Sequence, residues 1–373
     1  MKNEYVITET TKSIFSFKYQ TRGIFAKLSF FTIYVLIILL ISGCNKKKAH
    51  VEYEMETKTD ILIIYSNDNF INGGLSAIVI EEFEKRFECS VDVFGYGDSA
   101  ALLNHLITEK NNPKADLAIG ISSTQINRAL NENIFRINES ENIRNIRDRS
   151  LFLDRRYHLV PYNYDYYAFV YDSEIITTPP KTFGEMQNSV WNNKVIMPSP
   201  AYSSIGEGVV LWSLGIFGER GFDAFWDNLK RSILTVSNSM PESYITFQVG
   251  AAPIILSYVT NPIFHMEIEN IDKFRAFIPE EGRLKEIEFS GIINGSQNLY
   301  LARRFMDFML TYDFQKHIPT TIWKFPVIEG VELPDSFAAI TLPERDLSVN
   351  VFNRYLPYND AWTEQWLNIV GVK

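Results

Sequence analysis

Small polar side chains stand at two places where a loop leads into an expected helix. Asp98 and Ser99 end a glycine-containing loop, just ahead of a stretch in which leucines repeat at helical spacing. Ser203 and Ser204 precede an apolar helix predicted over residues 209–217. A helix N-terminus presents free backbone N–H groups that can hold an anion or the polar edge of a ligand. Asp and Ser are also favoured N-caps, so simple helix capping is the alternative function for all four residues.

A tyrosine stands at the end of an expected strand. Residues 254–257 form a short apolar run, and the segment Tyr258-Val259-Thr260-Asn261-Pro262 follows it with an Asn-Pro turn. Ligands of open α/β sheets bind at the carboxyl ends of strands. Tyr258 is therefore a candidate for the wall of a ligand cleft.

The residue types needed for catalysis or for a metal site are not grouped in the sequence. The histidines show no metal-ligand spacing, and there is no Gly-x-Ser-x-Gly, Walker or dinucleotide-binding motif. We therefore predict no catalytic constellation, no metal site and no cofactor. The histidines are His50, His105, His158, His265 and His317.

The first 43 residues have the composition of an export signal. A basic segment precedes the apolar run 28–41, which is followed by Ser42, Gly43 and Cys44. This order of a charged region, an apolar region and small residues is typical of a signal peptide, and the run is shorter than the roughly 20 residues of a spanning helix. We expect residues 1–43 to be removed and the body of the protein to be exported, with a plain membrane anchor as the alternative.

The sequence Ile-Ser-Gly-Cys at the end of this segment resembles a bacterial lipobox. That resemblance implies that Cys44 carries a lipid and becomes the first residue of the mature protein. The polar stretch 44–59 then predicts a tether between the membrane and the folded part. We expect a lipoprotein on the periplasmic or extracytoplasmic face of a membrane.

The mature chain would be strongly acidic. Loss of residues 1–43 removes five basic and two acidic side chains, which lowers the formal net charge from −9 to −12. Such a charge disfavours nucleic acid and anionic membrane surfaces as partners. It is compatible with a small cationic ligand.

Strand-like and helix-like segments alternate along the rest of the chain, which predicts an α/β protein with a mostly parallel sheet. Residues 161–172 stand out as a strand of aromatic and β-branched residues. We interpret this strand as the hinge between two lobes, with a plain sheet core as the alternative, and residues 286–293 as a return crossover. We expect the C-terminal tail with Trp362 and Trp366 to pack on the first lobe. Strands are predicted over residues 61–65, 90–94, 115–120, 194–197 and 254–257, and helices over 76–86, 123–131, 222–229 and 299–310.

Six blocks of the sequence resemble, in order and spacing, the thiamine-binding proteins of bacterial ABC importers. The resemblance covers nearly everything after residue 60. It is carried by Asp68 with Phe70, Gly-Asp-Ser-Ala-Ala-Leu-Leu-Asn at 97–104, Lys-Ala-Asp-Leu-Ala-Ile-Gly at 114–120, Ala-Phe-Val-Tyr-Asp at 168–172, Leu-Ser-Tyr-Val-Thr-Asn-Pro at 256–262 and Ile-Pro-Thr-Thr-Ile-Trp at 318–323.

The resemblance implies the type II periplasmic-binding-protein fold, in which two α/β lobes joined by crossover strands close on a ligand. It assigns residues 60–163 and 290–373 to lobe 1 and residues 164–289 to lobe 2. It further implies a monomer that binds thiamine or thiamine phosphates and delivers them to an ABC permease.

The resemblance also implies roles for individual residues. Asp98 and Ser99 would meet thiamine from lobe 1, and Ser203 and Ser204 would contact it from lobe 2 and reach a phosphate. The segment Tyr258, Val259, Thr260, Asn261 and Pro262 would form the wall, and Trp323 would flank the cleft. A thiazolium ring favours aromatic faces with negative charge nearby.

Three residues depart from the pattern of that family. Met240 stands where we expect a cleft tryptophan, Asn67 stands where we expect a tyrosine, and Asp165 replaces a glycine of the hinge motif. Loss of two aromatic surfaces, each worth very roughly 1 kcal/mol, predicts a lower thiamine affinity or a shift to a related ligand.

Two other functions remain open at this point. One is a binding protein for another small solute, such as ferric ion or a polyamine. The second is a lipoprotein that uses the same fold for sensing or interaction. Ferric ion would require several converging anionic oxygen ligands, and Tyr258 has no adjacent tyrosine in the sequence. An enzyme is the least favoured class, because no nucleophile and base are paired.

Overall fold

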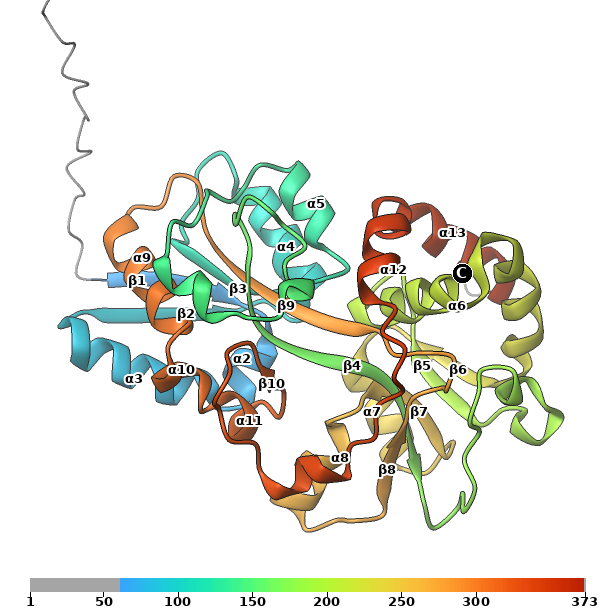
Figure 1. Ribbon diagram of the computed structural model, residues 1–373. Coiled ribbons are helices and arrows are strands. Elements are labelled where there is room, and N and C mark those ends of the chain that lie inside the picture. The colour runs from blue at the N-terminus through green and yellow to red at the C-terminus, as the bar shows by residue number, and fades with distance from the viewer. Residues whose placement is uncertain (1–60, 372–373) are drawn as a thin grey trace, which may run out of the picture. The chain divides into compact units, whose positions relative to one another are not determined.

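The computed structural model describes residues 61–371 (Figure 1). The predicted signal peptide, Cys44 and the tether lie outside the described residues. All of the described residues belong to one compact unit. Within this part of the chain, no helix is both long enough and apolar enough to cross a membrane.

A mixed sheet runs through the described part of the chain. In spatial order the strands are β2 (Ser90–Gly95), β1 (Ile61–Ser66), β3 (Leu117–Ser122), β9 (Lys285–Ile292), β4 (Val160–Asp172), β7 (Ile254–Tyr258), β5 (Val195–Pro198) and β6 (Ile233–Ser237). At one edge of the sheet the strands β2, β1 and β3 are parallel to one another, and at the other edge β7, β5 and β6 are parallel to one another. Between these two groups lie β9 and β4, which pair antiparallel with each other and with their neighbours. The mostly parallel sheet that we predicted is therefore found only in the outer groups.

Strand β4 connects the two groups of parallel strands, and Figure 1 shows it running beside β9 through the middle of the unit. Its first half pairs with β9, whereas its second half pairs with β7 and with β8 (Phe274–Phe277). The two-residue strand β10 (Phe325–Pro326) adds to β4 near Asn163 and Tyr164. The predicted strand at 161–172 and the predicted return strand at 286–293 are thus confirmed.

Helices cover the sheet, and the helices that we predicted lie close to their predicted ranges. The two apolar stretches predicted as separate helices join into one helix, α6 (Ser204–Leu229), which is interrupted at Gly218 with φ 63°. The helices other than α6 are α2 (Asp68–Asn72), α3 (Leu75–Phe87), α4 (Ser99–Glu109), α5 (Ile126–Asn131), α7 (Met240–Gln248), α8 (Asn261–Phe264), α9 (Leu299–Met309), α10 (Tyr312–Gln315), α11 (Ile318–Thr321), α12 (Ser348–Arg354) and α13 (Asn359–Val370). We did not predict β6, β8, α2, α7, α8 or the helices α10 to α13.

The C-terminal helices pack on α6 rather than on the first parallel group. Trp366 of α13 meets Trp226 of α6 edge to face, with ring centroids 5.4 Å apart, and Trp362 lies 5.2 Å from Phe222. The prediction that the tail packs on the first lobe is therefore wrong. An amphipathic helix shows in its sequence which face is buried but not against which partner.

Candidate functional site

The register between β4 and β9 brings acidic side chains together in the middle of the sheet. Asn163 lies opposite Glu288, and Asp165 lies opposite Glu286. Residues two apart in a strand point to the same face, and directly opposed residues are neighbours across the ladder. One face of the β4–β9 pair therefore carries three carboxylates, and all three are buried.

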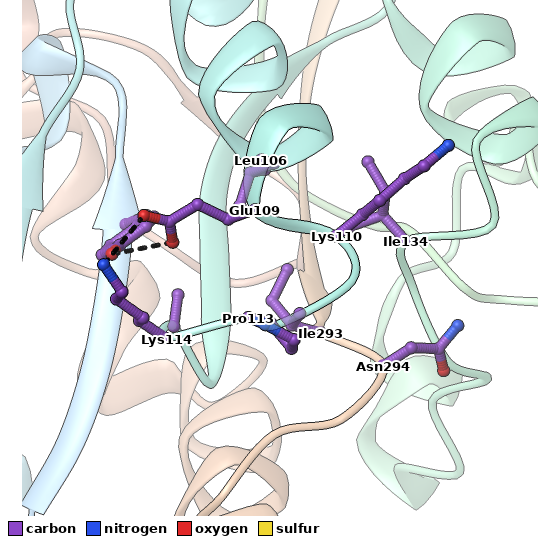
Figure 2. Close-up of a pocket in the computed structure, with 10 residues that line it drawn as sticks. Leu106, Glu109, Lys110, Pro113, Lys114, Ile134, Ile293 and Asn294 are labelled. Atoms are coloured by element: carbon purple, nitrogen blue, oxygen red, sulfur yellow. Dashed lines mark hydrogen bonds and ion pairs between the residues drawn. The ribbon is translucent and has the colours of Figure 1, made fainter.

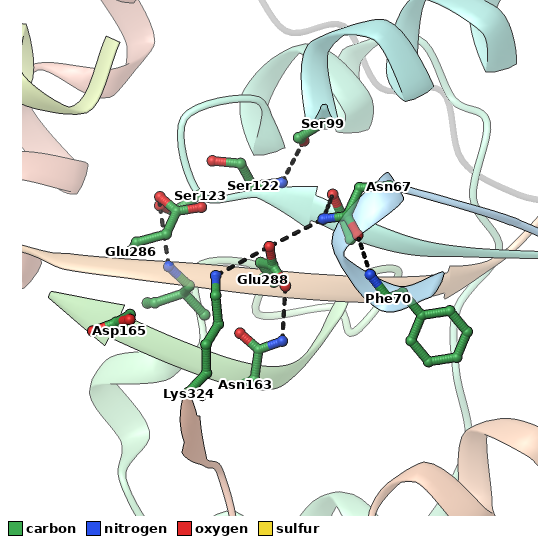
Figure 3. A network of polar contacts seen from close by, with 12 residues as sticks. Asn67, Phe70, Ser99, Ser122, Ser123, Asn163, Asp165, Glu286, Glu288 and Lys324 are labelled. Carbon is green, nitrogen blue, oxygen red and sulfur yellow. Dashed lines mark hydrogen bonds and ion pairs between the residues drawn. The ribbon is translucent and has the colours of Figure 1, made fainter. Parts of the chain in front are cut away.

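Glu288 is the most highly connected of these carboxylates (Figure 3). One oxygen accepts from the Tyr162 hydroxyl at 2.8 Å and from the Asn163 amide at 2.7 Å, and the other accepts from the Asn67 amide at 3.0 Å. Burial alone would raise the pKa of Glu288, but the nearby Lys324 ammonium and these donors hold it below the usual value. Glu288 is therefore an anion at neutral pH.

Glu286 and Asp165 are less fully compensated. Glu286 accepts hydrogen bonds from the hydroxyls of Tyr167 and Ser123, and Asp165 accepts from the hydroxyl of Thr260 and the backbone N–H of Tyr166. Burial raises the pKa of each of the two carboxyl groups to about 7. Both groups thus bind protons readily at neutral pH and would ionise fully if more positive charge came near.

One buried cation faces these carboxylates. The ammonium of Lys324, which immediately precedes β10, lies 3.2 Å from a Glu288 oxygen, and Figure 3 shows the side chain reaching toward β9. Burial by itself would lower the pKa of Lys324, but Glu288, Glu286 and Asp165 raise it above its usual value. With three carboxylates and one ammonium, the cluster carries a formal charge of −2 when all of its groups are ionised.

Tyr258 presents its aromatic face to the same cluster. The Lys324 nitrogen lies 4.8 Å from the centroid of the Tyr258 ring, and the ring of Tyr167 lies 5.8 Å away. Burial raises the pKa of the Tyr258 hydroxyl well above its usual value, and Glu286, Glu288, Asp165 and Asp98 add to this effect. The tyrosine is therefore a neutral ring surrounded by negative charge, which is a favourable environment for a cation.

A second acidic position lies where two helices begin. The carboxylate of Asp98 caps α4 by accepting from Ala101 N–H at 3.0 Å, and it lies near enough to the backbone N–H of Ser204, at the start of α6, for that group to lower its pKa. Burial raises its pKa despite these donors. Glu207, one turn into α6, accepts from Gln125 at 2.6 Å, and burial raises its pKa to about 7. This end of the site is therefore also acidic.

Comparison with known families identifies the chain. A model described as bacterial extracellular solute-binding protein matches residues 112–342. The chain belongs to this family. The thiamine-binding periplasmic protein of Brucella abortus biovar 1 (strain 9-941) is 33% identical over 314 residues, covering 83% of this chain and 91% of that protein. The thiamine-binding periplasmic protein of Escherichia coli (strain K12) is 30% identical over 316 residues, covering 83% and 94%.

Comparison with a solved structure identifies the fold of this chain. A periplasmic thiamin binding protein superposes with a TM-score of 0.73 and 28% identity, covering 83% of this chain and 96% of that one. The protein therefore has the type II periplasmic-binding-protein fold that we predicted, with α/β lobes joined by crossover strands. Strands β4 and β9 are the crossover strands that carry the acidic cluster.

Some of the residues predicted to bind the ligand lie at the buried cluster of Asp165, Glu286, Glu288 and Lys324. Tyr258 lies on Lys324, and Thr260 donates to Asp165. Asp98 meets the first turn of α6 at Ser204.

Other predicted residues have structural roles in the described part of the chain. The Ser99 hydroxyl accepts from Ser122 N–H at 2.6 Å, and Ser203 is the buried N-cap residue of α6, where its side chain makes no capping bond. Asn261 accepts from the Tyr244 hydroxyl at 3.2 Å. The side chains of Val259 and Pro262 are buried, while Trp323 is half-buried with a left-handed φ of 53°.

Two of the residues that depart from the family pattern are used in the network. The Asn67 side chain caps α2 through Phe70 N–H and holds Glu288, and Asp165 is one of the three cluster carboxylates. Met240 is the first residue of α7 and packs against the apolar core.

The sequence analysis missed Glu286, Glu288 and Lys324. The alternation Glu-Ile-Glu-Phe in an otherwise apolar strand was the signal for the two glutamates, because acidic residues are rarely buried without a partner.

Two glycines permit the close contacts of the network. A Cβ on Gly120, whose φ is +98°, would lie 2.3 Å from the Asn67 side chain. A Cβ on Gly208 in α6 would lie 2.1 Å from the ring of Tyr167, whose hydroxyl reaches Glu286. Any larger residue at either position would displace a member of the network.

Two hollows in the described part of the chain are lined by other residues. Figure 2 shows the smaller, about 10 Å³, beside Glu109, which accepts from the Tyr65 hydroxyl at 3.2 Å and pairs with Lys114 at 3.6 Å. It has room for about one water molecule. The larger, about 580 Å³, lies between the segment around residues 149–157 and α12, and its charged lining residues are Arg149 and Arg155. Neither hollow includes a residue predicted to bind the ligand, and the arginines of the larger one disfavour a cation.

The raised pKa values predict how stability depends on pH. Asp165, Glu207 and Glu286 have folded-state pKa values of about 7, above the usual 3.8 and 4.5. Between these limits the folded state binds more protons than the unfolded state, so the free energy of unfolding falls as pH rises from about 4 to about 7. We expect the melting temperature without ligand to be several degrees higher at pH 5 than at pH 8, as measured by calorimetry.

A variant pair tests the origin of this pH dependence. Glu286→Gln removes one of the three groups and should flatten the decrease between pH 5 and pH 8. Glu139→Gln changes an exposed residue that pairs with Arg303 at 3.5 Å, and it should leave the profile unchanged. A wild-type melting temperature that rises from pH 5 to pH 8 would show that the buried carboxyl groups do not hold extra protons.

Proposed function

We propose that this protein captures thiamine outside the cytoplasm and delivers it to an ABC permease. The observation that carries the proposal is the buried cluster of Asp165, Glu286 and Glu288 beside the face of Tyr258, with Lys324 as its cation. Thiamine is a permanent cation with an aromatic thiazolium ring. Aromatic faces with carboxylates nearby are the chemistry that recognises such a ring.

The names of the relatives agree with this chemistry. The proteins from Brucella abortus and Escherichia coli are thiamine-binding periplasmic proteins, and each is at least 30% identical over 83% of this chain. The excess negative charge also supports an organic cation in preference to a neutral or anionic solute. No step of the proposed function requires catalysis, and the family is one of extracellular solute-binding proteins.

The proposal includes an assignment of the two lobes. Of the described residues, 61–163 and much of the segment after residue 290 form lobe 1, and residues 164–289 form lobe 2, with α12 and α13 docked on α6 of lobe 2. Asp98 of lobe 1 and Ser204 of lobe 2 then come together at the start of their helices. Attraction between the Asp98 carboxylate and the Ser204 N–H would favour closure of the lobes over a bound ligand.

The proposal also covers the phosphates of thiamine and the membrane anchor. The N-terminus of the long helix α6, with Ser203 and Ser204, would be the place for a phosphate group, because its backbone N–H groups and dipole favour an anion. The phosphate would have to displace the Asp98 carboxylate, which lies near the Ser204 N–H. A lipid on Cys44 would hold a monomeric protein at the outer face of the membrane, close to the permease.

Titration of the full-length protein in detergent tests the ligand. Calorimetry with thiamine should give saturable binding with one site per chain. Thiamine monophosphate, spermidine and Fe(III) serve as comparators. Binding of spermidine or Fe(III) without binding of thiamine would show that the protein binds another class of solute, and the proposed ligand would be wrong.

The role of the Asp98 charge can be separated from its role as a helix cap. Asp98→Asn keeps a favoured N-cap residue for α4 but removes the negative charge. We expect about tenfold weaker thiamine binding, equivalent to about 1.4 kcal/mol, with little change in melting temperature. An affinity equal to wild type would show that Asp98 acts only as a cap.

A further inference from the structure

Lys324 is the cation of the buried cluster, and its position bears on how a ligand enters the site. Its ammonium lies 4.8 Å from the centroid of the Tyr258 ring and 3.2 Å from a Glu288 oxygen. The charges of Glu286 and Asp165 also act on it and raise its pKa. The place where an aromatic face and carboxylates converge is thus occupied by a side chain of the protein itself. On the proposed function, this is also the place that a cationic ligand would prefer.

We propose that Lys324 is an internal competitor for the ligand cation, so that binding of a cationic ring requires the lysine ammonium to leave the face of Tyr258. The inference rests on the proposed function for the identity of the ligand. It goes further by assigning to Lys324 a role in setting affinity and specificity.

The geometry favours competition over the other role that a cleft lysine can have, which is binding an anionic group. The Lys324 ammonium is surrounded by carboxylates. Burial by itself would lower its pKa, but Glu288, Glu286 and Asp165 raise the pKa above its usual value. A phosphate brought to this position would be repelled by Glu288, Glu286 and Asp165.

The length and flexibility of the lysine side chain make displacement feasible. Four methylene groups allow the ammonium to swing while the backbone of residue 324 stays in place. The half-buried neighbours Trp323 and Phe325 lie on either side of it in the chain. Affinity then depends on the difference between the interactions of the ligand cation and those of the lysine ammonium with the same groups.

Variants at this position separate charge from space. Lys324→Ala removes both the ammonium and its bulk. Lys324→Ala/Glu286→Gln restores the formal charge of the cluster to its wild-type value of −2, which also reduces the chance that unpaired buried carboxylates prevent folding. Lys324→Arg keeps a cation at the position and is the matched control. Folding is checked by circular dichroism and thermal melting.

Two ligands are titrated into each full-length variant by calorimetry at fixed pH and salt. Thiamine tests the proposed ligand, and tetramethylammonium tests the cation position without any pyrimidine ring. We expect both alanine variants to bind each ligand at least about tenfold more tightly than wild type, a free-energy change that corresponds to one decade of affinity. Lys324→Arg keeps a cation at the position, so its affinity for each ligand should stay within about threefold of wild type. A tenfold gain in affinity would mean that the competition had been lost.

The possible results separate the inference from the proposed function. If wild type binds thiamine and the alanine variants bind it equally or more weakly, the competition is wrong and the proposed function stands. If Lys324→Ala gains affinity but Lys324→Ala/Glu286→Gln does not, the gain comes from the added negative charge of the cluster and not from the space that Lys324 left. The inference is then also wrong. If no variant binds thiamine, the proposed function fails, and the tetramethylammonium result alone supports or overturns the inference.

A measurement on the wild-type protein gives an independent check that does not depend on the folding of a variant. The ε-methylene NMR signal of Lys324, assigned by its loss in Lys324→Arg, should be shifted upfield by the Tyr258 ring. Saturation with thiamine, or with tetramethylammonium if thiamine does not bind, should move it toward the position of an exposed lysine. A signal that stays in place while the ligand saturates would overturn the inference.

Discussion

Glu288→Ala is expected to lower the free energy of unfolding by about 3 kcal/mol. The substitution removes the closest carboxylate of the buried Lys324 ammonium and leaves the hydroxyl of Tyr162 and the amide of Asn163 without their acceptor. The Asn67 amide keeps only the Gly120 carbonyl, at 3.4 Å. Breaking a buried ion pair from one side costs about 3–5 kcal/mol, and an orphaned buried donor costs about 1–3 kcal/mol. We expect a value at the lower end because Glu286 and Asp165 remain near the ammonium.

Urea denaturation at pH 7, followed by tryptophan fluorescence, measures this effect. The matched control is Glu219→Ala, which breaks an exposed ion pair with Arg354 at 3.1 Å. An exposed pair contributes about 0–1 kcal/mol, so the control should unfold close to wild type. A Glu288→Ala protein as stable as the control would mean that Lys324 is compensated by the other carboxylates alone.

The crossover strands could be predicted from sequence because their composition is a local signal. The aromatic and β-branched run at 161–172 gave β4, and the capping residue Asp98 gave the start of α4 within one residue. Such signals depend on side-chain shape and on hydrogen bonds to the nearest backbone groups. For the same reason, most strands and long helices lie close to their predicted ranges.

The centre of the site could not be predicted because it depends on strand register and on distant pairing. Lys324 follows Trp323 in a loop, and a lysine in a loop is usually exposed. Only the pairing of β10 with β4 places it beside Glu288. The segment predicted to form the wall divides for a similar reason: the Tyr258 ring lies beside Lys324, whereas the side chains of Val259 and Pro262 are buried.

Tyr258→Leu is expected to weaken thiamine binding by about 10- to 30-fold where Lys324 does not occupy the ring, as in Lys324→Ala, and by less in wild type. Leucine keeps an apolar side chain at the end of β7 but removes the negative face of the ring, which now lies 4.8 Å from the Lys324 ammonium. A desolvated cation–π interaction contributes about 1–2 kcal/mol, and each 1.4 kcal/mol is a tenfold change in affinity. Calorimetric titration at constant pH measures the change.

The protein contains a matched control for this substitution and a second background that tests its cause. Tyr300 on α9 also has a cation over its ring, with Arg304 at 5.4 Å, but it is exposed, so Tyr300→Leu should leave thiamine affinity unchanged. In wild type the ligand gains only the difference between its own interaction with Tyr258 and that of Lys324. The cost of Tyr258→Leu should therefore be larger when Lys324→Ala is also present. An equal cost in both backgrounds would mean that the ligand and the lysine do not share the ring.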